Sequence, residues 1–279
     1  MWTILQIELF KIFRRPRTYI AFIAISAIVL LIQMALFSDG NVYVDFLLQS
    51  VGGDFVIEGK LLNGYFVCYF ILQTLLIHVP LLIALVGGDM LAGEANMGTL
   101  RLLVSKPIGR GSLIMGKFIA TMVYTLMLLV WMAILSLGLS MLVFGTDDLA
   151  IFQASKMVVL LKNDVLWRYV AAFGFAAIAM TTVAALSFFL SLFAENSIGP
   201  IVSTMSIVIL FTILTTMDLP LFNHIKPFLF TSHMLGWKGF FDDHVAYASI
   251  IRSGLYLLLH ILVLISLSVA IFKRKDVLS

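Results

Sequence analysis

Six long runs without a single charged side chain divide this 279-residue chain. They cover residues 19–37, 65–88, 118–144, 169–194, 198–217 and 254–272. Each run is close to the roughly 20 residues that a helix needs to cross a bilayer. Backbone groups in lipid must find their partners internally, and these runs lack the alternation of barrel strands. The sequence therefore predicts an all-α integral membrane protein, with six transmembrane helices in a single domain over residues 1–279.

The composition supports a membrane protein and argues against a soluble one. Hydrophobic residues make up 62% of the chain, whereas charged residues make up 12%, about half of the roughly 25% found in soluble domains. A soluble domain of this length could not bury so much apolar surface. The net charge of +3 is of the kind that membrane proteins carry in cytoplasmic loops, so we do not expect nucleic-acid binding.

The distribution of basic residues predicts the orientation. An even number of spans puts residues 1–18, 89–117, 195–197 and 273–279 on one side of the membrane, and these 57 positions hold 11 of the 18 lysines and arginines. Basic residues favour the cytoplasmic side. We therefore expect both termini to be cytoplasmic, in a multi-pass protein of the cytoplasmic (inner) membrane of a bacterium.

The N-terminal segment MWTILQIELFKIFRRPR mixes apolar and polar residues at helical spacing. This pattern predicts an amphipathic helix that lies in the cytoplasmic interface and ends near Pro16, before the first span. The alternative is a simple basic anchor that only sets the topology.

The loop over residues 218–253 is too aromatic for an ordinary solvated loop. Its aromatic residues include Phe222, Phe228, Phe230, Trp237, Phe240 and Phe241. We expect short re-entrant helices that dip into the outer face of the membrane. An ordinary folded aromatic loop is the alternative. The loops over residues 38–64 and 145–168 are mixed in composition and are expected to be modest connections.

Residues 111–118, GSLIMGKF, match most of a phosphate-binding P-loop. That motif needs a preceding strand and a Ser or Thr after the lysine to bind magnesium. Here Phe118 follows Lys117, no strand is predicted before the motif, and a membrane span follows it. We therefore expect no ATP site in this chain, and we expect Lys117 to extend its ammonium group to the cytoplasmic boundary.

The loop over residues 89–117 is the one substantial cytoplasmic loop. Its apolar residues recur near helical spacing, Gly98-Thr99 can break a helix, and Ser105-Lys106-Pro107 can end one. We predict short helices across the cytoplasmic face, with Glu94, Arg101 and Arg110 exposed.

The same loop carries a family resemblance. The matching residues are Gly93-Glu94, Gly98-Thr99-Leu100, Leu103, Ser105, Pro107, Arg110 and Gly116-Lys117. They resemble the loop signature of ABC-2 type transporter permeases, and the resemblance extends over the whole chain through the order of its spans and loops. It implies the membrane subunit of an ATP-driven transporter, in most cases an exporter, whose loop between spans two and three is a coupling helix.

The resemblance also implies the partners. Two copies of a soluble ATPase would dock below two permease subunits, identical or related, within the membrane lipid, and the ATPase would bind ATP and magnesium. This chain would bind no cofactor and would not be an enzyme by itself. The expected coupling residues are Gly93, Glu94, Gly98, Thr99, Leu100, Arg101, Pro107 and Arg110. The alternative is that the charged residues are merely solvated and that the glycines only shape the turn.

Polar residues inside the spans are the usual indicators of a transport pathway. Gln73, His78 and His260 are weak candidates, and Gln33 is a fourth polar residue; interhelical hydrogen bonding is the alternative for all of them. Cys68 lies in an apolar run and is expected to be a buried hydrophobic residue. A secondary transporter or a multi-pass membrane enzyme is the alternative function.

The residues that usually mark those alternatives are missing from the pattern. The spans contain no carboxylate for ion coupling, and the sequence shows no broken repeats. His224, His233, Asp242, Asp243 and His244 share the loop over residues 218–253, but their spacing does not match a compact metal motif. We therefore predict no catalytic and no metal-binding residues.

Overall fold

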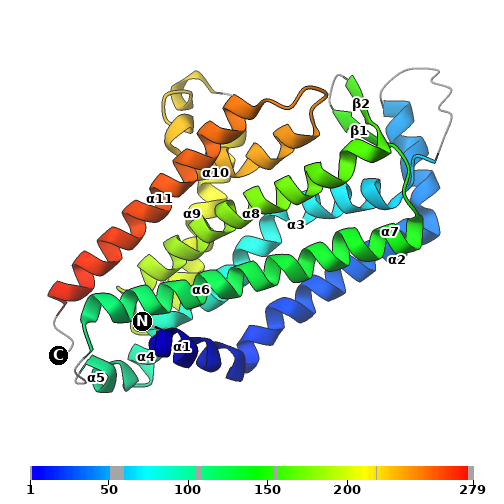
Figure 1. Cartoon of the computed structure of the whole chain (residues 1–279). Helices are drawn as coiled ribbons and strands as arrows, with labels where there is room; N and C mark the ends of the chain where they lie inside the picture. Colours follow the sequence, from blue (N-terminus) through cyan, green and yellow to red (C-terminus); the bar gives the residue numbers. More distant parts are fainter. Residues whose placement is uncertain (1, 51–59, 105–107, 154–155, 218, 276–279) are drawn as a thin grey trace.

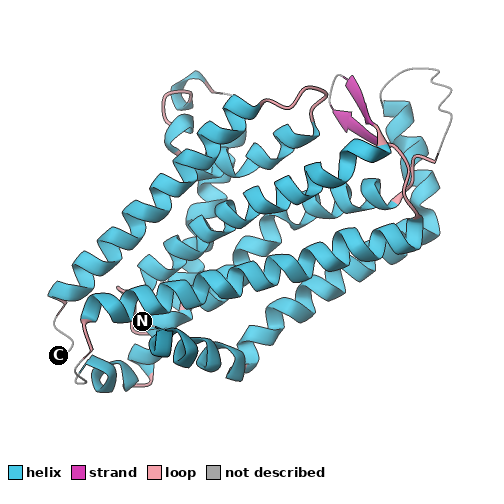
Figure 2. Ribbon diagram, viewed as in Figure 1, coloured by secondary structure: helices cyan, strands magenta, loops and turns pink. Residues whose placement is uncertain are grey.

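The computed structural model describes residues 2–50, 60–104, 108–153, 156–217 and 219–275. Within these residues the chain is an elongated helical bundle (Figures 1 and 2). The amphipathic helix α1 (Trp2–Arg14) lies at one end, beside the short helices α4 (Asp89–Asn96) and α5 (Thr99–Val104). The C-terminal end of α11 lies at the same end, which we call the terminal end. A hairpin marks the opposite end, called here the hairpin end.

Long helices connect the two ends. They are α2 (Pro16–Ser50), α3 (Gly64–Gly87), α6 (Arg110–Ala133), α8 (Lys162–Ser191), α9 (Ile198–Thr216) and α11 (Tyr247–Arg274). The α6 helix continues through the π-helical turn η1 (Ile134–Leu139) into α7 (Ser140–Phe144). Among the described residues, five helical segments are long and apolar enough to cross a membrane, and α3 brings the number to six if its two halves count as one span. The mostly helical architecture and these candidate spans agree with the predicted all-α membrane protein.

The helices extend beyond the predicted runs. The α2 helix continues from residue 37 to Ser50, α6 begins at Arg110 instead of residue 118, and α8 begins at Lys162 instead of residue 169. The predicted boundaries followed the loss of apolar character. A helix closes its hydrogen bonds within its own backbone and does not need to end where charged residues begin.

The α3 helix is bent by 55° between its halves, Gly64–Leu75 and His78–Gly87. Pro80 lies just after the bend. Proline lacks the backbone N–H group that would bind the carbonyl four residues earlier, and its side chain crowds that carbonyl. The proline therefore accounts for the bend.

The loop over residues 145–168 contains a hairpin that the sequence analysis missed. Strand β1 (Leu149–Gln153) pairs with strand β2 (Lys156–Leu160) in antiparallel register, with Leu149 opposite Leu160. In β2, Val158 and Leu160 are buried while Val159 between them is exposed. This alternation is typical of a strand with one buried face, but it covers too few residues to stand out beside long apolar runs.

The α8 helix forms the centre of the bundle. It packs against α3, α6, α9 and α11, and 61% of its most apolar stretch is buried, compared with 17% for α9 and 22% for α11. The outer helices therefore expose most of their apolar side chains. Lipid or another membrane subunit would cover such surfaces in a membrane.

The predicted re-entrant region consists of short helical segments. They are η2 (Pro220–Phe222), η3 (Lys226–Phe228), α10 (Phe230–Met234) and η4 (Leu235–Phe241). The aromatic residues divide between two roles: Phe230, Trp237 and Phe241 are buried, whereas Phe228 is exposed. The ring of Phe241 lies 4.8 Å from that of Tyr169 on α8. Part of the aromatic loop therefore belongs to the core, and its depth in the membrane stays a prediction.

A close contact between α3 and α7 provides a test of this packing. Asn63 accepts hydrogen bonds from the backbone N–H groups of Tyr65 and Phe66, both at 3.0 Å, and so caps α3. The next residue, Gly64, lies against the backbone of α7, where an added Cβ would come within 2.6 Å of the Ser140 carbonyl oxygen.

We predict that Gly64→Ala destabilises the protein by about 1–3 kcal/mol, because the methyl group would push two backbones apart. Gly138→Ala is the control, since nothing lies within 4 Å of a Cβ at that position. Thermal unfolding in detergent would measure both variants. Equal melting temperatures for the two would contradict the packing of α3 on α7.

Candidate functional site

A lysine that lies in the bundle without access to water is the centre of the site. Lys117 of α6 has a relative exposure of 0%. Its Nζ atom lies 2.8 Å from Oε2 of Glu8 on α1 and 2.7 Å from Oε2 of Glu94 on α4. The expectation that Lys117 extends to the membrane boundary is therefore wrong, because two carboxylates hold its ammonium group in the interior.

A second lysine completes the arrangement. The Nζ atom of Lys11 lies 2.9 Å from Oε1 of Glu8 and 2.9 Å from Oε1 of Glu94. Glu8, Lys11, Glu94 and Lys117 thus form a closed group with two positive and two negative charges, called here the charge cluster. Buried charges are tolerated when they are paired in this way. Glu94 is only 2% exposed, so the expectation of an exposed Glu94 is also wrong.

One contact in the charge cluster is ionic only. Oε2 of Glu94 has no hydrogen-bond partner among the described residues, although Lys117 Nζ is 2.7 Å away. This contact is therefore described as an ion pair.

The local sequence explains how three elements converge. Glu8 and Lys11 are three residues apart on α1, so they lie on one face of that helix. The α1 helix approaches α6 closely at Gly116, where an added Cβ would lie 2.6 Å from Cγ2 of Ile4. Gly116 thus admits α1, and the neighbouring Lys117 reaches its carboxylate. Residues 111–118, which resemble a P-loop, lie within α6 and form no loop.

A second group of polar residues anchors the start of α4. Asp89 accepts hydrogen bonds from Arg15, from Ser197 and, at 3.2 Å, from Arg17. Its carboxylate also lies at the positive end of the α4 dipole. Gly93 makes room for it, because an added Cβ would lie 2.3 Å from Asp89 Oδ1. The α4 helix is thereby tied to the starts of α2 and α9.

The pKa values follow from these pairs. Burial by itself would raise the pKa of Glu8, but Lys117 and Lys11 outweigh it and hold that pKa below its ordinary value of 4.5. Burial would lower the pKa of Lys11, but Glu8 and Glu94 raise it above 10.5. Both groups therefore stay charged over the physiological range.

The tip of the loop is exposed, and so is Leu102 of α5. Met97 is 57% exposed, and Gly98 has a φ of 69°, a backbone conformation that favours glycine. Thr99 donates a 3.3 Å hydrogen bond to the Glu94 carbonyl and links α5 to α4. A crevice of about 220 Å³ beside the tip is lined by Arg15, Pro16, Arg17, Asp89, Gly93, Asn96, Met97 and Ser197.

The remaining predicted coupling residues have different surroundings. The side chain of Leu100, on α5, is buried. Arg110 is partly buried and donates to the carbonyls of Lys273 (3.1 Å) and Lys275 (2.9 Å), so it holds the end of α11. The Arg101 side chain and Pro107 lie outside the described residues.

Two of the three pathway candidates form side-chain hydrogen bonds within their own helix. The Nδ1 atoms of His78 and His260 pair with the carbonyl four residues earlier in the same helix, at 3.0 and 2.7 Å. Gln73 accepts a 3.3 Å hydrogen bond from Lys238 of η4. Among the described residues, interhelical bonding is thus found for Gln73 but not for the two histidines. Gln33 also bridges helices, since it donates 2.9 Å and 2.8 Å bonds to Leu135 and Ser140.

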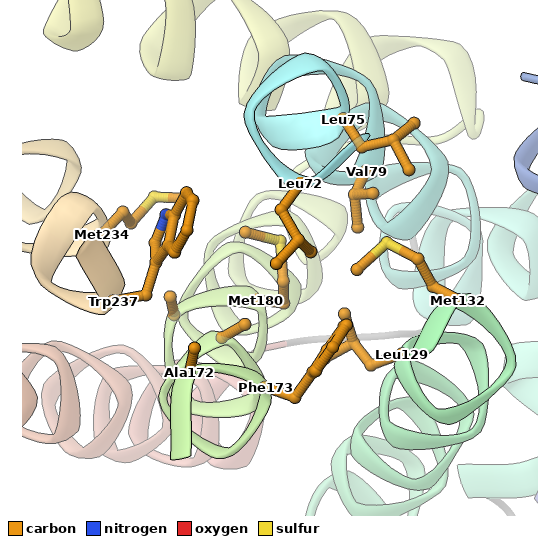
Figure 3. Close-up of a pocket in the computed structure, with 12 residues that line it drawn as sticks. Leu72, Leu75, Val79, Leu129, Met132, Ala172, Phe173, Met180, Met234 and Trp237 are labelled. Atoms are coloured by element: carbon orange, nitrogen blue, oxygen red, sulfur yellow. The ribbon is translucent and has the colours of Figure 1, made fainter. Parts of the chain in front are cut away.

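A cavity between α3, α6, α8 and the α10–η4 segment is small and apolar (Figure 3). Its volume is about 40 Å³, and Leu72, Val79, Leu129, Met180 and Trp237 are among the side chains that surround it. A water molecule there would find no polar partners, so this cavity does not resemble a substrate path. Cys68 is buried, as expected. No group of three or more metal-ligating side chains gathers among the described residues.

The sequence analysis missed Glu8, Lys11 and Asp89 as site residues. Apart from the pair of Glu8 and Lys11, the partners cited here are 72 to 109 positions away in the chain, which no local pattern reveals. One signal was available. Glu8 is an acidic residue in an otherwise basic segment, and Asp89 and Glu94 come shortly after an apolar run. These three carboxylates therefore needed partners of opposite charge.

We predict that Lys117→Met destabilises the protein by about 3–5 kcal/mol, because it leaves an excess buried negative charge. Adding Glu8→Gln to this variant should recover part of the loss, since Lys11 and Glu94 then form a neutral pair. Arg14→Met is the control, because Arg14 is an exposed cation on α1. Thermal unfolding in detergent measures all three, and a melting temperature of Lys117→Met equal to that of Arg14→Met would contradict the charge cluster.

The charge cluster also predicts how stability depends on pH. A carboxylate with a lowered pKa stabilises the fold above its ordinary pKa, and this contribution disappears as the pH falls through the folded-state value. The raised pKa of Lys11 stabilises the fold below its ordinary value of 10.5, and this contribution disappears as the pH rises through the folded-state value. The difference in melting temperature between the wild type and Glu8→Gln should therefore be constant between about pH 6 and 9 and should shrink below about pH 4.5. A difference that grows on acidification would be inconsistent with the pairing of Glu8.

Comparison with known proteins adds two findings. Over 94 residues the chain is 30% identical to the "Probable ABC transporter permease protein NosY" of Stutzerimonas stutzeri. The aligned part is 33% of this chain and 34% of that relative, so the similarity covers about a third of each protein. The model of the family described as "Protein of unknown function (DUF2705)" matches residues 20–278. Since this match includes all six long helices except the first turn of α2, the chain belongs to that family.

Proposed function

We propose that this protein is the permease subunit of an ATP-driven transporter of the ABC-2 type, and that α4 and α5 form its coupling element. The observation that carries the proposal is the attachment of α4. One short helix at the terminal end is joined by buried ion pairs to α1 and α6, and by Asp89 to the starts of α2 and α9. The partial similarity to a probable ABC transporter permease supports the same function.

The partners follow from this proposal. Two copies of a cytoplasmic ATPase would bind ATP and magnesium and would dock against the tip between α4 and α5. A second permease subunit, identical or related, would complete the path, and the sparsely buried faces of α9 and α11 leave apolar surface for it and for lipid. The chain itself would be no enzyme. Export is the proposed direction, and both termini would be cytoplasmic.

The proposed contact surface leaves out two of the residues named from the sequence, Glu94 and Arg110. Glu94 is engaged in the charge cluster and Arg110 holds the end of α11. Docking therefore falls to the exposed tip, with Met97, Gly98 and Thr99 at its centre and the polar crevice beside it. An apolar side chain next to arginines and a carboxylate is a suitable anchor for a protein partner.

The mechanism would be a rigid-body movement. A force on α4 along or across the membrane would reach α1 and α6 through the two ion pairs of Glu94, and it would reach α2 and α9 through Asp89. Pulling α4 away from α6 would separate buried charges, which costs more than moving the helices together. The α4 helix and its neighbours would therefore shift as one body and change access between the two faces.

Co-expression with an ABC ATPase encoded beside the gene tests the proposal. Affinity purification through a tag on the wild-type chain should also recover the ATPase. Met97→Asp should weaken the complex about tenfold or more, because it places a charge at the centre of the contact. Leu161→Asp is the control, since Leu161 is equally apolar and exposed but lies at the hairpin end.

ATP hydrolysis by the purified complex provides the second readout. Glu94→Lys is avoided, because it would disrupt the charge cluster and so report on folding. Failure of the wild type to retain any ATPase under mild extraction would remove the main support. The secondary transporter and the multi-pass enzyme would then become the leading functions.

A further inference from the structure

A long groove runs between α6 and α11 at the terminal end of the bundle. Its volume is about 690 Å³. One wall is formed by Met115 and Phe118 of α6, and the other by the C-terminal turns of α11. The α11 residues that line it are Ile261, Leu262, Ile265, Ser266, Val269, Ala270, Lys273 and Arg274.

The length of the groove matches one leaflet of a bilayer. From Ile261 to Arg274 the α11 helix rises about 20 Å at 1.5 Å per residue. Half of the hydrocarbon core of a membrane is about 15 Å thick. Except for Ser266, the lining residues up to Ala270 are apolar, so the groove offers an aliphatic surface about as long as an acyl chain.

The end of the groove is positively charged. Lys273 and Arg274 are exposed there, and no acidic residue lines the groove. Among the described residues, neither side chain forms an ion pair with a carboxylate. Both cations therefore lack a negative partner within this part of the chain.

Two features of α6 hold this end in position. Arg110 donates hydrogen bonds to the carbonyl oxygens of Lys273 and Lys275 and so fixes the end of α11 against α6. Gly111 leaves room for the lysine side chain, since an added Cβ would lie 3.2 Å from Cε of Lys273. The charged mouth is thus part of the packing of α11 on α6.

We propose that this groove binds a membrane phospholipid with an anionic headgroup. An acyl chain would lie along α11, and the phosphate would contact Lys273 and Arg274. A basic pocket next to an apolar groove is the arrangement that such lipids recognise. A second copy of this chain fits less well, because a two-fold axis through the groove would bring the same positive charges together. The site is independent of the proposed ATPase partner.

Native mass spectrometry of the delipidated full-length protein tests the proposal. The probes are phosphatidylglycerol and phosphatidylcholine of the same chain length. The wild type should bind one phosphatidylglycerol several-fold more tightly than phosphatidylcholine. The double variant Lys273→Gln, Arg274→Gln should lose about tenfold in affinity for phosphatidylglycerol, since two cations near the headgroup are removed, and its affinity for phosphatidylcholine should not change.

Matched variants separate this site from general membrane electrostatics. Arg252→Gln combined with Lys162→Gln removes two exposed cations from the hairpin end and should leave the preference intact. Ser266→Trp fills the groove without changing its charge and should weaken the binding of both lipids. Leu259→Trp lies outside the groove and should leave the binding of both lipids unchanged.

Three results would overturn the proposal. The first is an equal loss of phosphatidylglycerol affinity in the Lys273→Gln, Arg274→Gln variant and in the Arg252→Gln, Lys162→Gln variant. That result would mean a nonspecific electrostatic attraction. The second is displacement of the lipid by inorganic phosphate, which would mean a site for a soluble anion only. The third is a dimer that Ser266→Trp dissociates while lipid binding stays unchanged, which would mean that the groove is covered by a second copy.

Discussion

A lysine ammonium group without access to water constrains the whole terminal end. Lys117 is stable in the interior because Glu8 and Glu94 approach it from two other helices. Lys11 balances the second negative charge. A buried charge without a partner would cost several kcal/mol, so α1, α4 and α6 must meet at one point for the chain to fold. The position of α4 on the bundle therefore depends on electrostatic neutrality in addition to apolar contact.

The sequence predicts the spans well and the charge cluster poorly, and the reasons are physical. Lipid demands long uncharged helices, so each span leaves a local record in the chain. The charge cluster joins residues that are up to 109 positions apart. The local sequence around a lysine next to an apolar run is the same whether its side chain is buried or solvated. The hairpin was missed because its alternation covers a few residues. The bend of α3 has a local cause, because Pro80 acts on its own backbone.

The loop signature acquires a structural explanation. Gly116 admits Ile4, Lys117 joins the charge cluster, Gly93 makes room for the Asp89 carboxylate, and Arg110 holds the end of α11. Each of these residues attaches the loop to the bundle. Gly98 and Thr99 form the exposed turn. Several of the residues that resemble the permease signature thus determine how the loop is held, and among the described residues the tip is exposed to a partner.

Attachment by paired charges suits an element that must transmit force. Apolar contacts slide past one another at little cost, because one methylene replaces another. Paired charges in a low-dielectric site cannot slide, since any displacement beyond the length of a hydrogen bond leaves both partners desolvated and unpaired. The neutral cluster can nevertheless move as a unit, because its internal distances do not change. A displacement of α4 would therefore pass to α1 and α6 with little loss to local deformation, while the apolar outer helices remain able to adjust to lipid.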